Sequence, residues 1–184
     1  AELLSGALPP PGDLVDVMAP MVDQGRLTGW SARPDEQALF EQLDMAGTLP
    51  DPDGTDAVAV VFNNAVGNKI DYFLDAEIDH RVEADAATNT ADAALEVRLT
   101  NTAPTEGEPR YVIDNPIGLD VGDNRTWVSV FTRLPVDEVR LDGRPVQIER
   151  HTEAGYFVTS AFVRVPAGET RRLTLTMSGP LDVS

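Results

Sequence analysis

Residues 70–85 have the sequence IDYFLDAEIDHRVEAD, in which apolar and charged residues alternate. Every second residue from Ile70 onward is apolar except His80, and the residues between them are charged except Phe73. Because successive side chains of a strand point to opposite faces, this period of two predicts a β-strand with one buried and one wet face. Most strands have about five or six residues, so we expect this one to bend, bulge or pass between two sheets.

Further strand patterns surround this stretch and predict a mainly β chain. Residues 57–63 form a continuous apolar run, which is typical of a strand buried on both faces. Asp142-Gly143 predicts a tight hairpin turn. We expect other strands at residues 94–101, 110–113, 126–132 (a central strand), 139–141, 146–148, 156–165 and 170–177. Together they predict an immunoglobulin-like antiparallel β-sandwich, although the Cys…Trp…Cys framework of true immunoglobulin domains is missing.

The first fifty residues follow a different pattern. Apolar residues at helical spacing predict one helix between Asp13 and Gly25, shortened or kinked at Pro20. Pro34 followed by two acids predicts the start of a second helix that runs to Gly47. We therefore expect residues 1–50 to form a short helical segment, which packs on the sandwich or is the tail of a missing upstream domain. Residues 51–184 form the sandwich domain in this prediction.

Composition excludes several functional classes. The 184 residues carry a net charge of −17, which argues against binding to nucleic acid or to an anionic lipid surface. The chain contains no cysteine, so disulfides and cysteine-ligated metals are excluded. No stretch approaches the about 20 apolar residues of a membrane span, so we expect no direct membrane insertion.

The sequence contains no motif that declares a reaction. No nucleophile elbow or phosphate-binding glycine loop is present, and a zinc site at His80 or His151 would need ligands that the sequence does not place. We expect His151 to lie in a polar turn. The acids of residues 51–56 faintly resemble a calcium loop but lack its remaining ligands, so we interpret them as a turn. No cofactor is expected, and the lack of a catalytic motif favours a non-enzymatic chain without deciding the question.

The loop from Asn63 to Lys69 has two interpretations. Its asparagine amides could cap backbone groups in a tight turn, which the abundance of Asn and Gly favours. Alternatively, Asn64, Asn68 and Lys69 could donate hydrogen bonds to a ligand, together with Arg125. Asn124-Arg125-Thr126 also matches a glycosylation acceptor, but we expect Arg125 to pair with nearby acids.

Several ordered short motifs carry a resemblance to a known family. They are Trp-Ser-Ala-Arg-Pro-Asp-Glu-Gln-Ala-Leu at 30–39, Asn63-Asn64, Gly67-Asn68-Lys69, Asp-Tyr-Phe-Leu at 71–74 and Asn-Arg-Thr at 124–126. From about Gly25 onward the chain resembles the C-terminal half of the mainly actinobacterial family called domain of unknown function 4012. The resemblance implies an extracytoplasmic, membrane-anchored protein of the cell envelope. It also implies a preceding domain similar to cell-wall glycopolymer ligases of the LytR–CpsA–Psr type.

Two functions therefore remain open. The first is a non-catalytic extracytoplasmic β-sandwich module with a structural role or a role in binding envelope proteins or cell-wall glycans. The second is an accessory domain of a LytR–CpsA–Psr-like enzyme, in which the Asn63–Lys69 loop and Arg125 contact a sugar or lipid-phosphate substrate. No catalytic role is implied for any residue of this chain.

Overall fold

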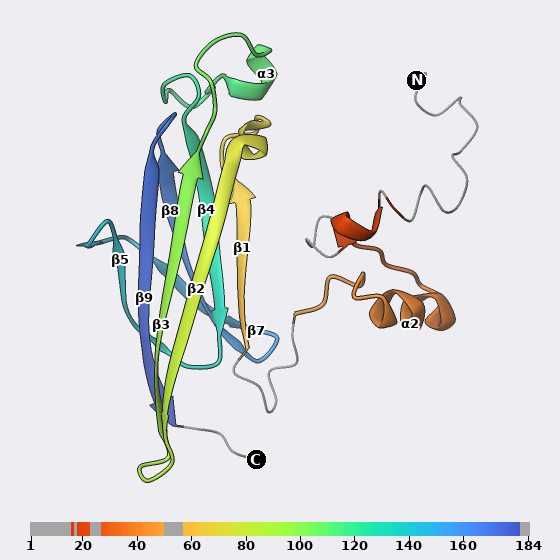
Figure 1. Ribbon diagram of the computed structural model, residues 1–184, viewed down its shortest axis with the longest axis vertical. Helices are drawn as coiled ribbons and strands as arrows, with labels where there is room; N and C mark the ends of the chain where they lie inside the picture. Colours follow the sequence, from red (N-terminus) through yellow and green to blue (C-terminus); the bar gives the residue numbers. More distant parts are fainter. Residues whose placement is uncertain (1–15, 17, 23–26, 50–56, 181–184) are drawn as a thin grey trace. The chain divides into compact units, whose positions relative to one another are not determined.

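The computed structural model describes residues 16, 18–22, 27–49 and 57–180. The chain divides into two units, Ala1–Leu49 and Pro50–Ser184, and each is considered by itself (Figure 1). The acids of residues 51–56, interpreted above as a turn, lie outside the described residues.

The first unit is helical where it is described. Residues 16 and 18–22 are helical, and α2 extends over Pro34–Gln42. Pro34 occupies the first turn, where its missing N–H is not needed, and Asp35 and Glu36 lie at the positive end of the helix dipole. The Ser31 hydroxyl donates to Glu36 over 2.7 Å and fixes the chain just before the helix. The prediction of a short helical segment near the N-terminus is confirmed.

The second unit is a sandwich of two antiparallel sheets (Figure 1). Sheet A has the order β1-β4-β8-β7, and sheet B has the order β2-β3-β9-β5-β6. The strands are β1 Val58–Asn64, β2 Leu74–Asp85, β3 Thr90–Asn101, β4 Asn124–Thr132, β5 Val136–Leu141, β6 Arg144–Pro145, β7 Glu149–Glu153, β8 Tyr156–Val165 and β9 Thr170–Pro180. The predicted mainly β fold and the sandwich are confirmed, as is the central position of β4.

The core lies between the two sheets. Inward side chains alternate with outward ones along each strand, so β3 contributes Leu95, Val97 and Leu99 while β4 contributes Val128 and Val130. All five are at most 1% exposed. The Asp142-Gly143 hairpin joins β5 to β6 with φ angles of 50° and 77°, as a tight primed turn requires.

The strand expected over residues 70–85 begins later than predicted. Ile70–Phe73 form the 3₁₀ helix η2, and β2 starts at Leu74. Ile70 is fully buried in a small second cluster with Ala103 and Ile113, and this anchor holds the chain in a turn before the strand starts. The predicted burial of one whole face of β2 is also wrong, because β2 is an edge strand and Ile78 on its inward side remains 48% exposed.

Four other predictions need correction. Residues 146–148 form no strand, because the strand that returns from the Asp142-Gly143 turn is β6 at Arg144–Pro145. Residues 57–63 are not buried on both faces, because β1 is an edge strand of sheet A and two of its residues, Val61 and Asn63, are exposed. Residues 110–113 form the helical turn α3 (Arg110–Ile113) rather than a strand, directly after Pro109, whose fixed φ suits a helix start. His151 lies in strand β7 instead of a turn.

Candidate functional site

The Asn64 side chain organises the turn that follows β1. Its Oδ1 accepts hydrogen bonds from the backbone N–H groups of Val66 (2.7 Å) and Gly67 (2.9 Å). Its Nδ2 donates to the Asn68 side-chain oxygen over 3.0 Å. The amide is therefore engaged by the turn itself, as in the first interpretation of this loop.

Asn68 links the same turn to the loop after α3. Its buried Nδ2 donates to the carbonyl oxygen of Asp114 over 3.0 Å, and its Oδ1 accepts from the Ile70 N–H over 3.3 Å. The Asp114 carboxylate accepts from the guanidinium of Arg110, which lowers its pKa below the ordinary value, and the N–H of Asn115 adds to that effect. Asn68 is thus part of the loop scaffold at this end of the sandwich.

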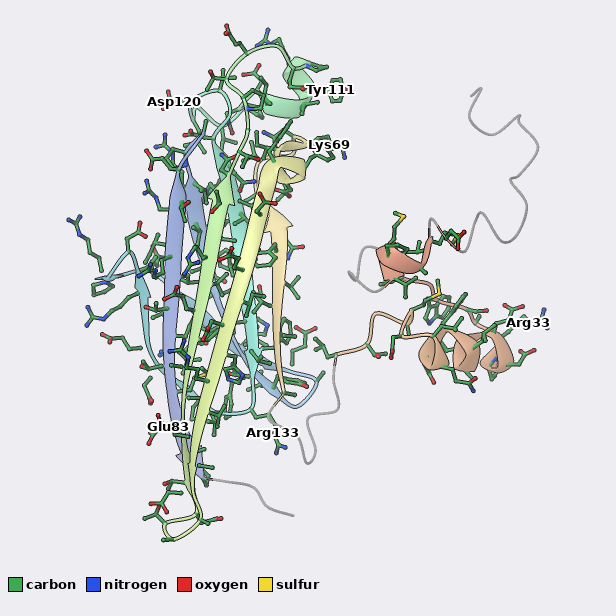
Figure 2. All side chains as sticks on the ribbon, in the orientation of Figure 1. Arg33, Lys69, Glu83, Tyr111, Asp120 and Arg133 are labelled. Atoms are coloured by element: carbon green, nitrogen blue, oxygen red, sulfur yellow. The ribbon has the colours of Figure 1, made fainter. Side chains whose placement is uncertain are left out.

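Lys69 and Arg125 differ from the two asparagines. Lys69 is exposed, and its side chain projects outward from the end of the sandwich (Figure 2). The Ala65 N–H donates to the Arg125 carbonyl over 2.9 Å, so the loop and strand β4 are neighbours. Among the described residues neither side chain forms an ion pair, which makes the expected pairing of Arg125 with acids wrong. The structure therefore brings Asn64 and Asn68 into contact and leaves the two cations separate from them.

Arg125 instead packs on an aromatic ring. Its guanidinium carbon lies 3.8 Å from the ring centroid of Phe162, which is within cation–π range. Phe162 also contacts Trp127, with ring centroids 4.3 Å apart and ring planes at 54°. Three side chains from two adjacent strands thus form one continuous stack.

The stack lies on the outer face of sheet A. Cross-strand register places Trp127 opposite both Asn63 of β1 and Phe162 of β8, and directly opposed side chains share a face. Inward neighbours such as Val128 belong to the core, so the stack points away from it. We call this surface the aromatic face and define it as Val61, Asn63, Arg125, Trp127 and Phe162.

The aromatic face combines exposed apolar area with hydrogen-bonding groups. Phe162 is 44% exposed, Val61 and Asn63 are exposed, and Trp127 and Arg125 are half-buried. Beside it, the Ser160 hydroxyl donates to Ser129 over 2.9 Å. From this surface, sequence reasoning named Arg125 and, as the first residue of the candidate loop, Asn63. Trp127 could have been found from the period of two in β4, because it alternates, like Arg125, with the inward residues of that strand.

The glycosylation pattern at 124–126 lies in the wrong environment for an acceptor. Asn124 and Thr126 are fully buried, and the Asn124 amide donates to the Asp71 carboxylate over 2.7 Å. An acceptor asparagine must be accessible to its transferase, so this folded site is closed to modification.

A shallow pocket of about 550 Å³ lies on sheet B and is lined by three arginines, Asp142, Gly143 and Thr170. Each arginine is paired with acids: Arg98 with Glu77 and Glu96, Arg172 with Glu96, and Arg171 with Asp142 and Glu169. The positive charge of the three arginines is therefore neutralised by neighbouring carboxylates, so the pocket attracts an anion only weakly.

Within the described ranges, no three His, Asp or Glu side chains gather closely enough to hold a metal ion. The His151 Nε2 atom lies 3.5 Å from a carboxylate oxygen of Glu153. No helix in the part of the chain that the structure describes is long and apolar enough to cross a membrane.

Comparison with protein-family models, curated proteins and solved structures finds no match to this chain. The resemblance to domain of unknown function 4012 thus stays a prediction from the short motifs.

Proposed function

We propose that this chain is a non-catalytic, extracytoplasmic β-sandwich module of a cell-envelope protein, and that its aromatic face binds a neutral cell-wall glycan. The observation that carries the proposal is the stack of Arg125, Phe162 and Trp127 on the outer side of sheet A, in which Phe162 is 44% exposed and the other two are half-buried. The envelope location rests on the family resemblance alone.

The chemistry of the aromatic face suits a sugar ring. The C–H bonds on one side of a sugar ring pack against the negative π face of an aromatic side chain. Hydroxyl groups at the ring edge need hydrogen-bond partners, which the guanidinium of Arg125 and the exposed amide of Asn63 can supply. A sheet surface presents these groups along one line, which suits an extended polymer.

The charge of the chain favours a neutral glycan over an acidic one. A net charge of −17 repels anionic polymers at long range. The single positive charge of Arg125, which has no ion-pair partner among the described residues, is too little to reverse that repulsion at physiological ionic strength, where the Debye length is about 8 Å.

Isothermal titration with a neutral β-glucan and a neutral galactan tests the proposal. We expect saturable binding of at least one polymer, with an affinity about tenfold lower in Phe162→Ala, because aromatic contacts contribute about 0.5–1.5 kcal/mol beyond area burial. Phe157→Ala is the matched control. Phe157 lies on the same strand and is 42% exposed, but it points to the opposite face.

Two outcomes would reject this function. One is the absence of binding to any neutral polymer of the panel. The other is an equal loss of affinity in the Phe162 and Phe157 variants, which would indicate general destabilisation.

The accessory-domain function is the alternative, and one observation favours it. Lys69 and Arg125 lack ion-pair partners among the described residues and could meet a lipid phosphate. Titration with polyprenyl-phosphate analogues tests it: binding that is lost in Lys69→Ala/Arg125→Ala supports this alternative, and no response to the analogues removes it.

A further inference from the structure

Strand β2 has an open hydrogen-bonding edge. It is 12 residues long and pairs with β3 in continuous register from Leu74↔Asn101 to Asp85↔Thr90. Among the described strands it has no neighbour on its other side (Figure 1). Exposed sheet edges are usually protected by short length, proline, a bulge or charged side chains, and of these β2 has only charged side chains, which are mostly acidic.

The inward side of β2 is also incompletely covered. Ile78 is opposite Val97, which is fully buried, yet Ile78 itself is 48% exposed. Ala76 and Ala84 on the same side are exposed as well. Leu74 and Val82 on this side pack against the core, so sheet A covers β2 only in part, and apolar surface at Ala76 and Ile78 remains open beside the free edge.

The outward side of β2 is acidic. Five of its 12 residues are acids and only Arg81 is basic. Glu77 pairs with Arg98 and Asp79 with Arg81, whereas Asp75 and Glu83 form no ion pair among the described residues. A strand added at this edge would place alternate side chains against the open apolar surface and against these acids.

We propose that β2 is a docking edge for an extended segment of a partner protein in which apolar residues alternate with lysine or arginine. The partner's backbone would continue the ladder of sheet B, its apolar side chains would cover Ile78, and its cations would lie beside Asp75 and Glu83. This inference uses a different surface from the aromatic face and does not depend on the proposed glycan.

Charge argues against two other occupants of the β2 edge, a second copy of this chain and the chain's own N-terminal residues. A second copy would bring a further net charge of −17 and oppose one acidic strand with another. The chain's own first 56 residues contain two basic residues, Arg26 and Arg33, against eleven acids. No alternating basic segment occurs there.

Binding of a designed peptide to the full chain tests the proposal. The probe is a fluorescein-labelled 12-residue peptide that alternates valine or isoleucine with lysine, measured by fluorescence anisotropy at 150 mM salt. We expect saturable binding, together with new protection of β2 backbone amides in hydrogen exchange. A peptide of the same composition in scrambled order should bind at least tenfold more weakly.

Charge-reversal variants distinguish docking at the β2 edge from a general attraction of the basic peptide to the acidic chain. Asp75→Lys/Glu83→Lys should lower the affinity at least tenfold and breaks no ion pair of the described residues. Asp137→Lys/Glu149→Lys makes the same change of charge on β5 and β7, and it should lower the affinity less than threefold. Equal losses in both variants, equal binding of the scrambled peptide, or β2 amides that are already fully protected in the free chain would overturn the proposal.

Discussion

Alanine substitution at two neighbouring strands measures how much of sheet B is covered. Leu95 on β3 and Ile78 on β2 both point to the inward side of the sheet. Each loses three carbons on substitution by alanine, so the chemical change is the same. Their environments differ, since Leu95 is 1% exposed and Ile78 is 48% exposed.

The expected costs follow from burial. Three buried carbons contribute about 2.4 kcal/mol at about 0.8 kcal/mol each, and the cavity left in a packed core raises the cost of Leu95→Ala to about 3–4 kcal/mol. About half of the Ile78 side chain is already in water, and no closed cavity forms at the edge. Ile78→Ala should therefore cost only about 1 kcal/mol.

Urea unfolding followed by far-ultraviolet circular dichroism gives both free energies of unfolding, with the slope m as a check that the unfolded states are comparable. A cost of about 1 kcal/mol for Ile78→Ala beside about 3 kcal/mol or more for Leu95→Ala supports the open edge. Similar costs above about 2.5 kcal/mol for both variants would refute the reasoning, because they would mean that the inward side of β2 is covered.

Three further predictions concern turns and loops. Gly122→Ala should lower the free energy of unfolding by about 1–3 kcal/mol in the same assay, because its φ is 84° and a Cβ would lie 2.9 Å from the Pro104 carbonyl oxygen; an unchanged midpoint would contradict this. Ala154→Asn should raise the stability by about 0.5–1 kcal/mol, since Ala154 has a φ of 49° in the β7–β8 turn and asparagine tolerates that region better; a lower midpoint would count against it. Asp114→Asn should destabilise the chain at pH 7. The pKa of Asp114 is lowered from 3.8 in the folded state, so its contribution is complete above the unfolded pKa and is lost as the pH falls through the folded pKa. The unfolding curves of the unchanged chain and of Asp114→Asn should therefore differ at pH 7 and converge toward pH 2. A difference that stays constant with pH would exclude the Arg110–Asp114 ion pair as the cause.

Local patterns predicted most of the strands because they depend on neighbouring residues only. The period of two in residues 74–85 and the Asp142-Gly143 turn are examples, and both appear where they were expected. Some of the failures arose from contacts distant in sequence. Ile70 fits a strand pattern, but its burial against Ala103 and Ile113 places it in η2 instead.

The candidate site was harder to predict than the fold. The turn chemistry of Asn64 and Asn68 is local, so one of the two interpretations described their hydrogen bonds correctly. The aromatic face depends on the register between β4 and β8, which brings Trp127 next to Phe162 across 35 positions of sequence. No local pattern contains that register, so neither Trp127 nor Phe162 was named beforehand.

The most direct test of the aromatic face is the accessibility of Trp127 to acrylamide in a Trp30→Phe background, which removes the other tryptophan of the chain. Saturation with the bound neutral glycan should lower the quenching constant of Trp127 about twofold, and in Phe162→Ala the same decrease should need about tenfold more glycan. An unchanged quenching constant at saturation would show that the glycan binds elsewhere and would contradict the proposed function.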